Sequence, residues 1–133
     1  SDSWGSAETV ELCGKDCYGL FFSTHYAAAG AKGATKAFID RYNKKHGYVP
    51  DDVAALTWDA LGLVQASIQS CGKITGNVEK DRQCIRDAMA KIKEYDGITG
   101  KMTFTEDGDP IKCAVIVKIN DSGEYEFYKS SCP

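Results

Sequence analysis

Long apolar runs, blocks of basic residues and a targeting segment are all missing from this 133-residue sequence. No apolar run approaches the roughly 18 residues that a membrane span requires, and the first residues do not pair a charged stretch with an apolar one. The formal net charge is -3, with 16 Lys and Arg residues scattered among 19 Asp and Glu residues. A nucleic-acid partner and direct insertion into a membrane are therefore not expected of this segment.

The signatures of catalysis and of metal binding are missing as well. The sequence contains no GxSxG, Walker or GxGxxG motif, and no Ser or Cys nucleophile stands beside a plausible base. The two histidines, His25 and His46, lack zinc-site spacing to any cysteine. We therefore expect no enzyme activity, no metal and no cofactor.

Cysteine is abundant, in contrast, with six residues in an even number and without CxxC spacing. Such usage favours disulfides in an oxidising compartment over zinc binding. A short loop separates Cys71, at the end of one helical stretch, from Cys84, at the start of the next. Cys113 and Cys132 lie near opposite ends of an expected hairpin, where cross-strand neighbours can be bridged. By elimination Cys13 pairs with Cys17. The alternative for each cysteine is a small buried apolar residue.

The hydrophobic pattern predicts a mixed α/β chain. Residues 19–26 form a continuous apolar and β-prone run, which is typical of a strand buried in a parallel sheet. Helical spacing predicts a short helix ending at Gly14 and three longer ones, over residues 34–46, from Pro50 onward, and over about 81–93. Three short strands in a meander are expected over residues 100–104, 113–119 and 124–128.

The helix that follows Pro50 has the widest apolar face. Val53, Leu56, Ala60, Val64 and Ser67 form one stripe, which is widened by Leu61, Leu63 and Ile68. One strand and a three-stranded meander offer too little surface to cover this face and those of the other helices. The sequence therefore indicates that part of the partner surface for these helices is missing.

Several blocks resemble, in the same order, the C-terminal part of the type I periplasmic solute-binding proteins of ABC transporters. This group includes the leucine/isoleucine/valine-binding proteins. The resemblance spans nearly the whole chain and rests most on a Phe-x-x-x-Tyr helix, a Trp-Asp-Ala triplet and a Gly-x-x-Gly-x-x-x-Phe hairpin followed by Asp-Gly-Asp-Pro. The matching blocks are SDSWGSAE, YGLFFSTHYA, KAFIDRYNKKHGYVPDDVAALTWDALGLV and IRDAMAKIKEYDGITGKMTFTEDGDPIKCAVIVKI.

The resemblance implies a partial periplasmic-binding-protein type I fold, in which this chain contributes to both lobes and to the hinge. Residues 1–26 and 97–133 would belong to the second lobe, and residues 27–96 to the first. An upstream segment or a second chain would complete the fold. The 133 residues alone are then not expected to form a compact monomer.

The resemblance also indicates ligand-binding residues, namely Asp2, Ser3, Trp4 and Tyr26. Asp2 matches an acidic position that pairs with the α-ammonium of an amino-acid ligand in the family, since a carboxylate can compensate a cation that leaves water. Ser3 would add a hydrogen bond, and Trp4 would form an aromatic wall. Tyr26 stands at the carboxyl end of a strand, where open α/β sheets bind ligands. The alternatives are a solvated turn for Asp2 and Ser3 and simple packing for Trp4.

The implied function is an extracytoplasmic, periplasmic or cell-surface, solute-binding protein. It would capture a small ligand, an amino acid or related carboxylate, between two lobes and deliver it to an ABC permease. A ligand-sensing domain of a receptor with the same fold is the alternative. The residues that would bind the ligand's carboxylate are expected outside this chain, so the sequence does not identify the ligand.

Overall fold

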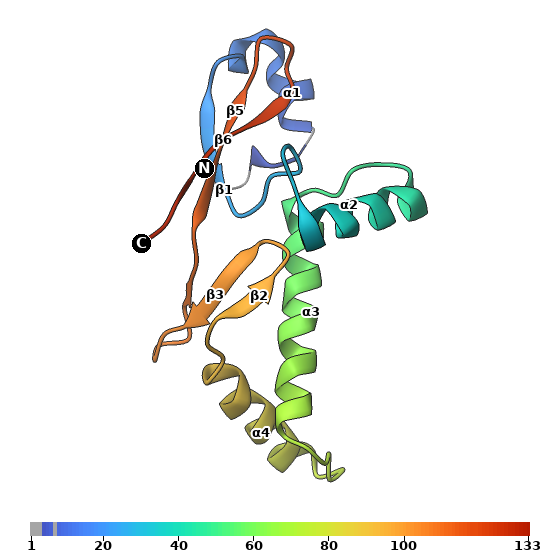
Figure 1. Cartoon of the computed structure of the whole chain (residues 1–133), viewed down its shortest axis with the longest axis vertical. Coiled ribbons are helices and arrows are strands. Elements are labelled where there is room, and N and C mark those ends of the chain that lie inside the picture. The colour runs from blue at the N-terminus through green and yellow to red at the C-terminus, as the bar shows by residue number, and fades with distance from the viewer. Residues whose placement is uncertain (1–3, 7) are drawn as a thin grey trace.

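The computed structural model describes residues 4–6 and 8–133. It contains two small sheets joined by helices, with the first sheet, β1-β5-β6, in the upper part of Figure 1 and the second, β2-β3-β4, beside the long helix α3. The elements are α1 (Glu8–Cys13), the 3-10 helix η2 (Gly14–Cys17), β1 (Phe21–Thr24), α2 (Gly33–His46), α3 (Asp52–Ser70), α4 (Val78–Ala90), β2 (Tyr95–Gly97), β3 (Gly100–Phe104), β4 (Pro110–Ile111), β5 (Ala114–Ile119) and β6 (Tyr125–Ser131).

The first sheet is antiparallel throughout. β1 pairs with β5 so that Phe22 faces Val117 across the sheet, and β5 pairs with β6 through a register shift at Ile116 and Val117. A small core of Cys17, Phe22, Val117 and Ile119 lies on one face, and the half-buried Trp4 and Tyr125 pack against it. This core ties the two ends of the chain to the same sheet.

The expected parallel sheet is therefore wrong for this part of the chain. The neighbour of β1 is the C-terminal hairpin, whose strand β5 runs in the opposite direction. Burial along β1 also alternates, because Phe21 is 51% exposed and Phe22 only 4%. A continuous apolar run does not reveal this alternation, since an exposed phenylalanine and a buried one look identical in the sequence. In the described residues β1 is an edge strand with one partner.

The strands expected over residues 100–104, 113–119 and 124–128 all form, as β3, β5 and β6. They do not make a single meander, because the chain first adds β4 to the second sheet and then passes to the first through residues 112–113. Two short strands escaped the sequence pattern, namely β2 and β4. β2 pairs with β3 in a tight hairpin, in which Gly97 faces Gly100.

The helices begin and end near the expected residues. Gly47 closes α2 in the left-handed conformation, and its amide donates to the Asn43 carbonyl. The Asp51 side chain caps α3 by accepting from the Ala54 amide. α4 begins three residues earlier than expected, at Val78, because the Asn77 side chain caps it by accepting from the Lys80 amide.

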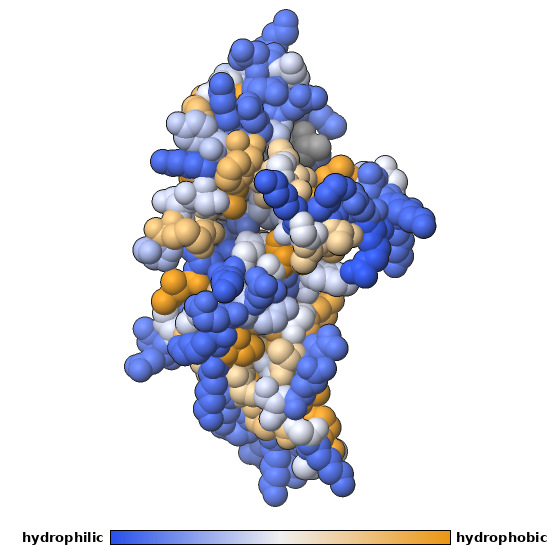
Figure 2. Space-filling view, in the orientation of Figure 1, coloured by the Kyte–Doolittle hydropathy of each residue, from blue (hydrophilic) through white to orange (hydrophobic). Residues whose placement is uncertain are grey.

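The buried face of α3 differs from the expected apolar stripe. Its buried residues are Asp52, Ala55, Asp59, Leu63 and Ser67, which recur at helical spacing. The apolar side chains expected inside are largely exposed, with Val53 and Leu61 each 65% exposed and Val64 and Ile68 somewhat less. Figure 2 shows apolar surface along α3 between polar patches. The expected surplus of apolar helix surface is therefore present.

The buried carboxylate of Asp59 joins α3 to the hairpin β2–β3. Its oxygens accept hydrogen bonds from the amides of Ile98 (2.8 Å) and Thr99 (2.9 Å) and from the Thr99 hydroxyl (2.6 Å). The carboxylate also lies against Gly97, where a Cβ atom would stand 2.5 Å from an oxygen. The Lys112 ammonium in turn donates to the Thr99 hydroxyl at 2.7 Å, and burial lowers the pKa of Lys112. The Trp-Asp-Ala triplet and the glycine-rich hairpin are thus parts of one contact.

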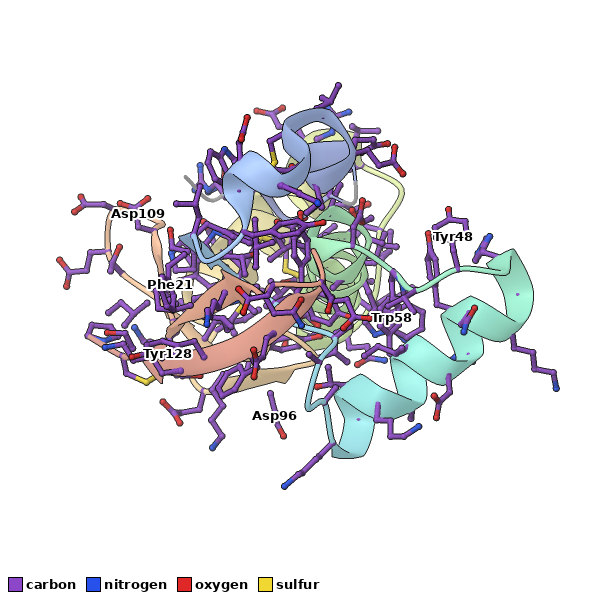
Figure 3. The ribbon with its side chains drawn as sticks, turned by 90° about the horizontal axis from the view of Figure 1, so that it is seen from above. Phe21, Tyr48, Trp58, Asp96, Asp109 and Tyr128 are labelled. Atoms are coloured by element: carbon purple, nitrogen blue, oxygen red, sulfur yellow. A yellow bond between two sulfur atoms is a disulfide. The ribbon has the colours of Figure 1, made fainter. Side chains whose placement is uncertain are left out.

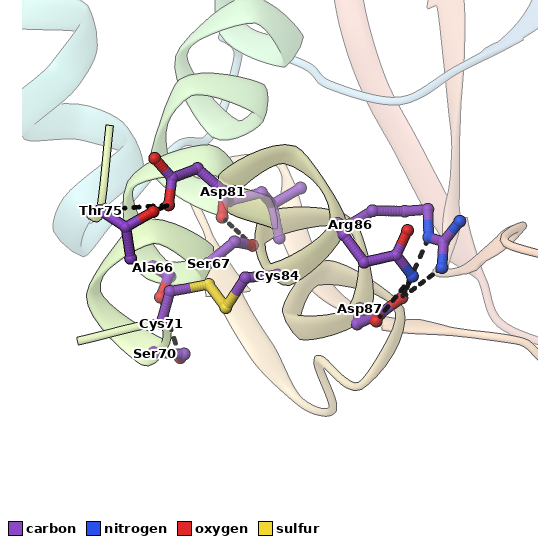
Figure 4. Close-up of a disulfide and its surroundings, with 11 residues drawn as sticks. Ala66, Ser67, Ser70, Cys71, Thr75, Asp81, Cys84, Arg86 and Asp87 are labelled. Atoms are coloured by element: carbon purple, nitrogen blue, oxygen red, sulfur yellow. Dashed lines mark hydrogen bonds and ion pairs between the residues drawn. A yellow bond between two sulfur atoms is a disulfide. The ribbon is translucent and has the colours of Figure 1, made fainter. Parts of the chain in front are cut away.

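The three expected disulfides are all present. Cys13 pairs with Cys17, Cys71 with Cys84, and Cys113 with Cys132. The Cys71–Cys84 bridge connects the end of α3 to α4, and beside it the Asp81 carboxylate accepts hydrogen bonds from Thr75 (Figure 4). These bonds hold the pKa of Asp81 below its usual value.

Replacing Asp59 by asparagine should lower the free energy of unfolding by about 3 kcal/mol, because the amide leaves buried donors of the hairpin without an acceptor. The matched control is Asp96→Asn in β2, since Asp96 is exposed and projects away from the ribbon (Figure 3). It should change stability by less than about 0.5 kcal/mol. Urea denaturation of the protein expressed from its complete gene measures both, and equal effects would contradict this role of Asp59.

The isolated 133-residue chain should not behave as a compact monomer, because the apolar face of α3 is exposed in it. Analytical ultracentrifugation should show association or an expanded chain, and heating should give no sharp transition. A compact monomer with a cooperative melting curve would disprove this expectation.

Candidate ligand-binding site

A cavity of about 610 Å³ lies where the first sheet meets the amino end of α3. Three segments far apart in the sequence line part of it: the loop at Gly5 and Ser6, the end of β1 with residues 26–29, and residues 48–52. Residues of α1 and of the hairpin β5–β6 complete the lining. Its size is within the usual range for small-molecule sites. Tyr48, which borders it, stands at the turn between α2 and α3 (Figure 3).

The side chain of Asp52 is the contact point of these three segments. It is 8% exposed, and its oxygens accept hydrogen bonds from the Thr24 hydroxyl at 3.2 Å and the Val53 amide at 3.0 Å. Gly5 packs directly on it, since a Cβ atom at this position would stand 2.7 to 2.9 Å from the carboxylate. Only glycine allows the loop to approach so closely. One carboxylate thus connects the loop, β1 and α3.

Tyr26, a residue expected in the site, does line the cavity. It is only 7% exposed, and its ring packs with Phe38 and Ala55. Its hydroxyl is buried and has no hydrogen-bond partner within residues 4–6 and 8–133. Burial, and secondarily the negative charge of Asp51, raises the pKa of Tyr26 to about 12. The side chain is therefore a neutral donor at physiological pH.

Trp4 lies on the first sheet rather than on the cavity wall formed by the described residues. Its ring is 6.4 Å from that of Phe22. The Tyr125 hydroxyl contacts the carbonyl oxygens of Trp4 (2.7 Å) and Ser6 (2.6 Å) and so holds the loop in place. This arrangement fits the packing alternative for Trp4, and its contact with a ligand stays a prediction.

Asp2 and Ser3, the other expected site residues, lie outside the described residues. Sequence reasoning did not select Thr24, Gly5 or the Asp52 carboxylate. One available signal was Pro-Asp-Asp at the start of a helix, where only one aspartate is needed as the cap.

A smaller hollow of about 200 Å³ also borders Tyr26 and is lined by His25, Thr35 and Ile98 among others. The Thr35 hydroxyl donates to the Ile98 carbonyl at 2.8 Å, which fastens α2 to the hairpin β2–β3. Trp58 lies elsewhere, packed on Phe38 with the Arg41 guanidinium 4.8 Å above its ring.

Metal-ligand clusters and membrane-spanning helices were also sought. No group of three or more His, Cys, Asp or Glu side chains in residues 4–6 and 8–133 could hold a metal ion. No helix in the described part of the chain is long and apolar enough to cross a bilayer.

Comparison with protein-family models matches residues 3–124 to the periplasmic binding proteins. The chain belongs to this family. Its fold corresponds to part of a periplasmic binding protein of type I, as the resemblance implied. A comparison with curated protein sequences found no match.

Solved structures of periplasmic binding proteins resemble the chain along almost its whole length. A leucine-binding protein from Thermotoga maritima is 28% identical, with a TM-score of 0.85 over 99% of this chain and 36% of that one. The branched-chain amino acid binding protein LivJ from Streptococcus pneumoniae, solved with isoleucine, is 26% identical, with a TM-score of 0.80 and the same coverage. A solute-binding protein from R. palustris, solved with benzoate, shares the fold at 20% identity, a TM-score of 0.75, 100% coverage of this chain and 34% of that one. The chain therefore spans about a third of the length of these relatives.

Tyr26 should make the protein sensitive to alkaline pH. Its pKa is raised from 10.0 in the unfolded chain to about 12 in the fold, so its neutral form supports folding fully below pH 10. This support is lost as the pH rises from 10 to 12. Tyr26→Phe should lose less stability than the wild type between pH 9 and pH 11 in urea denaturation. The exposed Tyr128→Phe is the control and should follow the wild type, and identical curves for all three would contradict the assignment.

Proposed function

We propose that this chain is part of an extracytoplasmic solute-binding protein, which captures a small ligand between two lobes for import by an ABC permease. The ligand class we propose is an amino acid or a related carboxylate. The observation that carries the proposal is the cavity at Asp52. Residues of both expected lobes line this cavity, in a chain that belongs to the periplasmic binding proteins. The relatives solved with isoleucine and with benzoate support the ligand class.

The two lobes would correspond to the two sheets and the helices packed on them. Residues 1–26 and the C-terminal hairpin form the second lobe in this proposal, and α2, α3 and α4 belong to the first. The hairpin β2–β3, bonded to Asp59, moves with α3. In this proposal the boundary expected at residue 97 lies instead after β4, at residues 112–113. Together with residues 25–32, this segment forms the hinge crossings, and closure would be a hinge motion.

Within the site, we propose that Asp2 receives the α-ammonium of the ligand and that Ser3 adds a hydrogen bond. Trp4 would shield the ligand from water at the mouth of the cleft. Tyr26 would donate its hydroxyl, which has no partner among the described residues, from the hinge side. Binding would need no cofactor and no metal, and the protein would not be an enzyme. The remaining groups would come from an upstream segment or a second chain that completes the fold.

The proposed location is the periplasm or cell surface. Three disulfides in one domain support an oxidising compartment. The alternative function is a ligand-sensing domain of a receptor with the same fold. A permease gene beside the complete gene favours transport, and a signalling domain within it favours the sensor.

Ligand binding should depend on Asp2. A thermal-shift screen of the protein from its complete gene against amino acids, aromatic acids and short amides should identify an amino acid as ligand. Asp2→Asn should then weaken its binding by about 2 to 5 kcal/mol, because a desolvated ammonium loses its partner. Asp121→Asn, in the turn between β5 and β6, is the control and should bind normally. Unchanged affinity of Asp2→Asn in calorimetry would remove Asp2 from the site.

A further inference from the structure

The walls of the cavity at Asp52 carry charge of one sign only. Among the described residues that line it there are five carboxylates and no Lys, Arg or His. None of the ion pairs within residues 4–6 and 8–133 involves one of these carboxylates. The five are Glu8, Glu11, Asp51, Asp52 and Glu126. Such a cavity favours a cation over an anion.

Asp52 is the carboxylate for which the lack of a cation costs most. It is 8% exposed, and the hydrogen bonds that it accepts come from neutral donors, the Thr24 hydroxyl and the Val53 amide. A buried carboxylate is normally paired with a cation, because neutral donors only partly replace its hydration. Its neighbour Asp51 lies one residue away at the same helix end and adds a second negative charge.

An independent feature is the hydroxyl of Tyr26, a residue that also lines the cavity. It is buried and lacks a partner within the described residues, and Asp51 acts on it electrostatically. A buried hydroxyl without a partner is rare and costs free energy until a bound group supplies one. It can accept a hydrogen bond from an ammonium as readily as it donates one.

We propose that the cavity binds the side-chain cation of a basic amino acid, with Asp52 and Asp51 as its counter-ions and the Tyr26 hydroxyl as an additional hydrogen-bond partner. This inference rests on the proposed function, in which Asp2 receives the α-ammonium of the same ligand. Apolar lining is present for the alkyl stem, from Phe22, Ala28 and Val49. The ligand would thus carry two cationic groups, and the carboxylates would select it against a neutral branched side chain.

Isothermal titration calorimetry of the protein from its complete gene tests this with L-lysine, L-leucine and benzoate as probes. We expect L-lysine to bind at least about tenfold more tightly than L-leucine, and benzoate to bind most weakly, because the walls repel an anion. The preference for lysine should shrink as salt is added. Leucine binding as tightly as lysine overturns this inference and leaves the proposed function standing. Failure of all three probes to bind overturns both.

Variants of Asp52 and Asp51 test whether the side-chain cation of the ligand binds at these carboxylates. Asp52→Asn should weaken lysine binding at least about tenfold more than it weakens leucine binding. Asp51→Asn keeps the helix cap, since asparagine caps equally well, and should reduce the same preference if Asp52→Asn does not fold. Asp107→Asn, in the exposed turn between β3 and β4, is the charge-matched control and should bind as the wild type. A lysine preference that survives in both Asp51→Asn and a folded Asp52→Asn overturns the inference.

Discussion

The contact of the Asp52 carboxylate with Thr24 and Gly5 is the constraint on which the candidate site depends. It brings together the loop near the start of the chain, the end of β1 and the first turn of α3. A larger residue at Gly5 would displace the loop, and an apolar residue at position 52 would leave the Thr24 hydroxyl without its acceptor. These three segments, which line the cavity together with α1 and the hairpin β5–β6, meet at one buried carboxylate. The negative charge of this carboxylate is also part of the ligand preference that we propose.

A second buried carboxylate, Asp59, lies two turns further along the same helix and also connects it to another segment. It joins α3 to the hairpin β2–β3 by accepting two amide hydrogen bonds and one from a hydroxyl. The buried side of α3 is thus as much polar as apolar, and many of its large aliphatic side chains face outward. Such a helix is anchored by hydrogen bonds to the elements present here, while much of its apolar side stays exposed.

Local sequence signals predicted most elements, because caps and stops act over a few residues. Gly47 and Asp51 mark the helix ends, and the pairing of Cys71 with Cys84 follows from their separation by a short loop. The antiparallel partner of β1 and the buried face of α3 could not be predicted, since both depend on residues far away in the sequence. Tyr26 was expected in the site from its place at a strand end, and it lines the cavity, while its contact with a ligand stays a prediction. The burial of Asp52 could not be predicted, because it depends on Gly5 and Thr24.

A crystal structure of the protein expressed from its complete gene, with its tightest-binding ligand, tests the central claim most directly. We expect the ligand in the cavity between the first sheet and the start of α3, within hydrogen-bond distance of the Tyr26 hydroxyl and the Asp52 carboxylate. A ligand bound between the lobes without contact to either residue would contradict the account.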